Sequence, residues 1–122
     1  MTRKELDEHY KLLDFLHQAQ EMQRHIQKKA EKEKGNARLF PALQDSLADI
    51  EKSIAHYEKQ IAESAPCVVA FIDSVDVQQA KQLLRYHYVY GMAWCEVSDV
   101  VHKSESACRM VCNRYLKKRG IV

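Results

Sequence analysis

The sequence predicts an all-α protein with an N-terminal antiparallel helical hairpin and a C-terminal helix-turn-helix. Only 3 Gly and 2 Pro occur among 122 residues, and 30% of the residues are charged. Apolar residues recur every three or four positions over most of the chain, which is the period of amphipathic helices. The 46% apolar content is ordinary for a chain that buries a core. We therefore expect a coiled-coil-like hairpin over residues 1–65 and a helix-turn-helix region over residues 66–122.

The first predicted helix begins at Thr2. Thr2 and Glu5 have the spacing of a capping box, in which each side chain satisfies a free backbone amide at the helix start. An apolar stripe follows and extends the helix to about Lys34. Its members are Leu12, Phe15, Ala19, Met22, Ile26 and Ala30.

The second predicted helix carries the clearest periodicity of the chain. Gly35 is expected to end the first helix in a left-handed conformation, residues 35–40 to form a turn, and Pro41 to lie in the first turn of the next helix. A heptad seam follows, with Leu43, Leu47, Ile50, Ile54, Tyr57 and Ile61. Two such helices predict a hairpin roughly 35 to 45 Å long. Because a two-helix hairpin buries too little surface to be stable alone, it should dock on the C-terminal region, on a partner, or on its own copy as a homodimer or higher homo-oligomer.

The segment after the hairpin predicts shorter helices. Pro66 is expected to end or kink the second helix. Residues 67–75 are rich in β-branched side chains, but no other strand-like segment is present to pair with them, so a short buried helix is favoured. Asp76 and Gln79 repeat the capping-box spacing and predict a further helix that Gly91 stops.

The last segment has the pattern of a helix-turn-helix. One helix is expected over residues 94–101, and Ser104 is expected to cap another that runs to about Arg119 and is closed by Gly120. The inward positions are Val97, Val101, Cys108 and Val111. His102 occupies the turn position usually given to Gly, and His is among the residues enriched at positive φ. The outward positions of the last helix are Glu105, Ser106, Arg109, Met110, Asn113, Arg114 and Lys117.

Cationic side chains concentrate towards the C-terminus. Residues 76–122 carry 8 Lys/Arg and 4 Asp/Glu, whereas residues 1–75 carry 11 and 13. From Lys103 onward Glu105 is the one acidic residue. A surface that binds a polyanion is therefore expected there, and the alternative is a helix face that only keeps the protein soluble.

Residues 77–119 resemble region 4 of bacterial sigma factors, and more closely the phage-encoded sigma-like transcriptional regulators of Gram-positive bacteria. The matching residues are Arg85-Tyr86, Gly91, Trp94, Glu96-Val97 and Ser104. In that family an Arg-Tyr helix, a Gly turn, an aromatic residue, a Glu-Ile-Ala helix and a Ser-capped recognition helix follow in this order. Three positions depart from the pattern: Ser98 replaces Ala, His102 replaces Gly, and Cys108 replaces Val.

The resemblance implies a transcriptional regulator of phage or prophage origin that binds double-stranded DNA and uses its hairpin either for dimerisation or for contact with RNA polymerase. Phosphate contacts are implied for Lys103, Arg114, Lys117, Lys118 and Arg119, and base-edge contacts for Ser106, Arg109 and Asn113. Ser104 and Met110 complete the implied interface. Arg109 matches the O6/N7 acceptor pair of guanine, and Asn113 is suited to adenine. Four to six neutralised phosphates give only about 10⁻⁴ to 10⁻⁶ M affinity, so a dimer or delivery by RNA polymerase is expected.

Other interpretations of the sequence are weaker. A helical protein–protein interaction module without DNA binding is the main alternative. Cys95, Cys108 and Cys112 with His102 lack zinc-ligand spacing and are expected to be packing residues, so neither a metal nor a cofactor is predicted.

Three further properties of the protein are expected from its sequence. The chain carries no catalytic motif, so no enzyme is predicted. Solvent exposure is expected for four histidines, His9, His17, His25 and His56, whereas Trp94 is expected to be buried. The longest apolar run is too short to cross a bilayer and the N-terminus lacks a signal-peptide core, so a cytoplasmic protein without membrane contact is expected.

Overall fold

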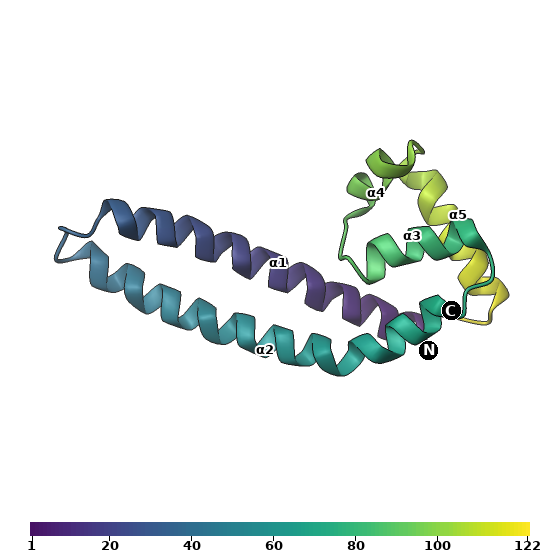
Figure 1. Cartoon of the computed structure of the whole chain (residues 1–122), viewed down its shortest axis with the longest axis horizontal. Helices are drawn as coiled ribbons and strands as arrows, with labels where there is room; N and C mark the ends of the chain where they lie inside the picture. The colour runs from purple at the N-terminus through teal and green to yellow at the C-terminus, as the bar shows by residue number, and fades with distance from the viewer.

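The computed structural model describes residues 1–122 as five helices, which confirms the all-α class. The helices are α1 (Arg3–Lys32), α2 (Leu39–Asp73), α3 (Gln78–Tyr88), α4 (Trp94–Val101) and α5 (Glu105–Lys118). Figure 1 shows α1 and α2 as a long antiparallel pair, with the three short helices gathered at the end where both termini lie. The predicted hairpin is therefore present, and it is joined to the C-terminal helices at one end only.

The N-terminal cap is confirmed, but the turn between α1 and α2 differs from the prediction. The Thr2 hydroxyl oxygen accepts a hydrogen bond from the Glu5 amide at 3.1 Å. At the other end, Gly35 does not adopt a left-handed conformation. The Asn36 side-chain oxygen accepts instead from the backbone amides of Arg38 and Leu39, at 3.1 and 2.9 Å. An Asx-type turn therefore closes the hairpin, and it does not need a glycine at positive φ.

Helix α2 continues through Pro66 to Asp73, so residues 67–75 do not form a separate helix. The predicted boundary between residues 65 and 66 consequently falls inside α2. Figure 1 shows that α2 bends towards its C-terminal end. A proline within a helix costs about 3 kcal/mol, but three apolar residues beyond it, Val68, Phe71 and Ile72, are buried and contribute roughly 1.5 to 3 kcal/mol each. Tertiary burial therefore carries the helix past the proline.

The core lies where the hairpin meets α3, α4 and α5. Its buried cluster consists of Leu6, Val68, Phe71, Ile72, Val75, Ala80, Leu83, Leu84, Tyr88, Val97, Cys108, Cys112, Tyr115, Leu116 and Ile121. Leu6 is the one member from α1, and it is 0% exposed. Between Tyr10 and Cys67 the only buried residue is Ala30. The outer part of the hairpin therefore leaves its heptad seam half covered.

The start of α3 corrects another prediction. The N-cap residue of α3 is Val77, and no side chain caps this helix, so the capping box of Asp76 and Gln79 is wrong. The Asp76 carboxylate accepts from the Tyr115 hydroxyl at 2.9 Å, and this hydrogen bond holds its pKa below the ordinary value. Asp76 thus fastens the chain before α3 to α5, which competes with its use as a cap.

Two histidines are buried. His9, expected on the surface, is 3% exposed, and its Nδ1 lies 2.6 Å from the Ser64 hydroxyl oxygen of α2. His87 stacks between the rings of Tyr10 and Trp94, at centroid distances of 3.9 and 4.1 Å. Trp94 is half-buried rather than fully buried. The other three histidines expected on the surface, His17, His25 and His56, are exposed as predicted.

We predict that stability falls on mild acidification because of these histidines. Burial lowers the pKa of His87 from 6.5 to about 4, and it also lowers the pKa of His9. Between pH 6.5 and about pH 4 the unfolded chain binds more protons than the folded chain. The stabilisation by neutral His87 is therefore complete above pH 6.5, the pKa in the unfolded chain, and decreases as the pH falls towards 4. The shift of His87 alone corresponds to about 3 kcal/mol at pH 4.

Urea unfolding at neutral and acidic pH checks this prediction. The variant His87→Asn removes the titrating ring, so it should lose less stability on acidification than the wild type. An equal loss in both proteins would contradict the assignment to His87. His25→Asn removes an exposed histidine of α1, so it should behave like the wild type and serves as the control.

Candidate nucleic-acid interface

Helices α4 and α5 form a helix-turn-helix arrangement around the turn that contains His102. His102 adopts φ 56° and ψ 41°, which confirms the predicted left-handed turn position. The Ser98 hydroxyl donates to the Lys103 carbonyl across the turn. The Ser104 hydroxyl oxygen accepts from the Ala107 amide at 3.1 Å, so the predicted cap of α5 is also present. Local sequence therefore fixes the angle at which α5 leaves α4.

The inner faces of the two helices pack as predicted. Val97 and Cys108 are 0% exposed, and Val101 and Val111 pack partly buried against the same core. Cys112 is also buried, and burial raises the pKa of its thiol to about 12. A thiol with such a pKa stays protonated and is a poor metal ligand. No group of three or more His, Cys, Asp or Glu side chains is placed to hold a metal ion.

The outward side of α5 and its preceding turn form one polar surface, which we call the exposed α5 face. It consists of Lys103, Ser104, Ser106, Arg109, Met110, Asn113, Arg114, Lys117 and Lys118, and all nine residues are exposed. Met110, 47% exposed, is its apolar member. Glu105 is half-buried and pairs with Arg109 at 3.6 Å. The residues expected from the sequence are therefore brought together on one side of one helix.

Arg119 departs from the phosphate-binding role expected for it. Its Nη1 donates to the Tyr115 hydroxyl oxygen at 2.6 Å, and its guanidinium carbon lies 5.4 Å from the centre of the Phe71 ring. The Nη2 atom approaches the Ser74 hydroxyl oxygen at 3.4 Å. Arg119 thus turns back to the protein and links the end of α5 to the end of α2.

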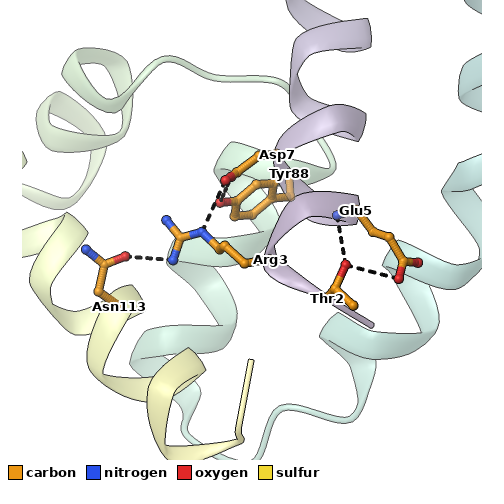
Figure 2. A network of polar contacts seen from close by, with 6 residues as sticks. All are labelled: Thr2, Arg3, Glu5, Asp7, Tyr88 and Asn113. Atoms are coloured by element: carbon orange, nitrogen blue, oxygen red, sulfur yellow. Dashed lines mark hydrogen bonds and ion pairs between the residues drawn. The ribbon is translucent and has the colours of Figure 1, made fainter. Parts of the chain in front are cut away.

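The sequence did not predict one residue that contacts the exposed α5 face. Arg3, in the first turn of α1, donates from Nη1 to Asn113 Oδ1 at 2.8 Å. The Arg3 Nε lies 3.5 Å from Asp7 Oδ2, and Asp7 Oδ1 accepts from the Tyr88 hydroxyl at 3.0 Å. Figure 2 shows these groups as a continuous chain from α3 through α1 to α5. The one local signal was a cation at a helix N-terminus, where the helix dipole favours an anion.

Comparison of the chain with protein-family models, with curated proteins and with solved structures finds no match. None of the five helices combines the length and the apolar character needed to cross a membrane. What the exposed α5 face can bind is therefore inferred from its own side chains. They offer cationic groups, hydrogen-bond donors and one apolar contact on a helix of 14 residues.

Proposed function

We propose that this chain is a sequence-specific, double-stranded DNA-binding transcriptional regulator of phage or prophage origin that acts in the cytoplasm. The observation that supports this function is the exposed α5 face, which follows a capped helix-turn-helix turn and faces away from the core. A helix of this width enters the major groove of B-DNA, where side chains near its N-terminus reach the base edges.

Seven of the nine residues of the exposed α5 face fall into two groups by chemistry. Lys103, Arg114, Lys117 and Lys118 supply phosphate contacts, which fix the position of the helix but carry no sequence information. Ser106, Arg109 and Met110 lie within the first two turns of α5 and meet base edges. To bind guanine, Arg109 must break its ion pair with Glu105. The free-energy cost is small, because an exposed ion pair contributes only about 0 to 1 kcal/mol.

Titration of a fluorescent duplex at several salt concentrations tests this function. We expect a slope of about −4 in log K against log salt concentration for each bound copy, and a decrease in the magnitude of the slope by about 1 in Arg114→Ala or Lys117→Ala. Arg109→Ala should weaken binding to the preferred DNA sequence by about 1 to 3 kcal/mol and leave binding to other sequences nearly unchanged.

Lys52→Ala is the matched control, because Lys52 is an exposed cation in the middle of α2. It should bind like the wild type. Binding that does not respond to salt, or equal effects of Lys52→Ala and Arg114→Ala, would contradict a DNA interface on α5.

The proposed regulator forms a dimer through the outer part of the hairpin. There the two helices border a groove of about 520 Å³, which includes Leu12, Phe15 and Gln60, and a second one of about 220 Å³ beside Met22. Phe15 is 44% and Met22 56% exposed, so this stripe is not covered within one chain. A second copy of the chain can cover this stripe, because apolar residues at heptad spacing pack against the same positions of a partner helix. The same groove is lined by Glu8, Glu63 and Lys11, so both signs of charge lie on one patch, which suits a self-complementary two-fold contact.

Dimerisation compensates for the weak binding of a single α5 helix. Two copies of the exposed α5 face would engage half-sites about one helical turn apart and gain affinity from being linked. Alternatively, contact between the same hairpin and RNA polymerase would bring the weakly binding α5 helix to its DNA site.

A helical protein–protein interaction module is the second candidate function. The mostly apolar groove beside the exposed Phe15 and Met22 favours it, since exposed apolar patches mark interaction surfaces. The two candidates separate in the salt titration, because a module of this kind leaves the duplex unbound at every salt concentration.

A further inference from the structure

The contact between Arg3 and Asn113 decides which atoms of Asn113 are available to a ligand. A guanidinium carries five hydrogen-bond donors and no acceptor. Only the oxygen of the Asn113 amide can therefore face Arg3, and it does so at 2.8 Å. Figure 2 shows the amide nitrogen of Asn113 on the side away from Arg3. Asn113 is exposed, so that nitrogen presents its two hydrogens to solvent.

The position of Arg3 is itself fixed from the core. Tyr88 is 1% exposed, and burial raises the pKa of its hydroxyl above the ordinary value, so it remains a donor. That hydroxyl donates to Asp7, and Asp7 pairs with Arg3 one helical turn earlier. Thr2 caps the same turn of α1. A fixed side chain loses little entropy when it holds Asn113, so the orientation of the amide is prepared before any ligand arrives.

We infer that Arg3 is a positioning residue that makes Asn113 a donor-only reader, with guanine as its target in place of adenine. This inference rests on the proposed function. Adenine is read by an Asn that accepts from N6 and donates to N7 at the same time. Here the oxygen is held by a charged donor, and such hydrogen bonds are roughly twice as strong as neutral ones. Guanine presents two acceptors, O6 and N7, and therefore matches the amide hydrogens that remain.

Selection from a pool of duplexes with a randomised central segment tests the inference. The base pair read by Asn113 is the one whose preference disappears in Asn113→Ala. At that base pair the wild type should prefer guanine over adenine by about fivefold or more, the lower end of discrimination by a specific contact. Arg3→Met frees the amide oxygen and should reverse the preference to adenine. Arg3→Lys keeps a cation that only donates hydrogen bonds, so it should keep the preference for guanine.

A double variant separates positioning from a general loss of structure or charge. Arg3→Met should have no effect on base preference in the Asn113→Ala background, because the two residues act as a unit. Thermal unfolding of Arg3→Met should show a melting transition close to that of the wild type, as expected for a variant that keeps the fold. Three outcomes would overturn the inference while the DNA-binding function stands. The wild type and Arg3→Met could prefer the same base, or the wild type could already prefer adenine. Arg3→Met could also lose affinity without a change in the preferred base. Absence of salt-dependent duplex binding by the wild type would remove both.

Discussion

Replacement of Leu6 by Ala is expected to lower the free energy of unfolding by about 3 to 5 kcal/mol. Leu6 is 0% exposed and is the one residue of α1 in the buried cluster, so truncation leaves a cavity between α1 and the C-terminal helices. The loss should also loosen the contacts of Arg3 and Tyr10 with that region, because both residues lie within four positions of Leu6. Urea unfolding followed by circular dichroism measures the change.

The control for this prediction is Leu16→Ala. Leu16 lies on the same helix but is only half-buried, so its truncation should cost less than half as much. Equal losses in the two variants would show that the start of α1 is not part of the core. The outcome decides whether the hairpin and the C-terminal helices are one folding unit, as the shared cluster indicates.

The double variant Phe15→Glu/Met22→Glu is expected to abolish self-association. Both side chains are exposed in the single chain, so the substitutions should leave the fold intact, but they place two charges in the apolar stripe of the proposed dimer. Affinity for a duplex with two half-sites should fall by about a hundredfold or more, the gain usual for linked binding sites. Affinity for a single half-site should stay unchanged.

Sedimentation velocity at tens of micromolar protein, together with the duplex titration, measures both effects. Val69→Glu is the matched control, because Val69 is 40% exposed on α2 and does not border either groove. A wild-type chain that sediments as a monomer would contradict dimerisation through the hairpin. A dimer that survives the double variant would place the contact on another surface.

Local sequence was sufficient for several parts of the structure. The cap at Thr2, the cap at Ser104 and the left-handed turn at His102 all follow the prediction. Each depends on residues within four positions of one another, and no long-range hydrogen bond to these side chains competes with the local contact. The exposed α5 face was predictable for the same reason, because helical periodicity alone separates Cys108 from Arg109 and Met110.

Other residues were mispredicted because long-range contacts outweighed their local preference. Of the two outcomes expected at Pro66, α2 bends near its C-terminal end and does not stop, since apolar residues beyond Pro66 are buried in the core, so the separate helix expected over residues 67–75 is absent (Figure 1). Asp76 binds Tyr115 instead of capping α3, and Arg119 folds back onto α2 instead of facing a ligand. His9 is buried against Ser64, which lies 55 residues away along the chain. None of these partners could be identified from spacing.

The sequence by itself determined the all-α class, the caps at Thr2 and Ser104 and the cationic side of α5, because these depend on short-range hydrogen bonds and on the helical period. The tertiary structure alone decided how α1 joins the C-terminal helices and how Arg3 meets Asn113, 110 residues further on. The physical reason is that the contact energy between distant residues exists only after the chain has closed the loop between them, and no local pattern records it.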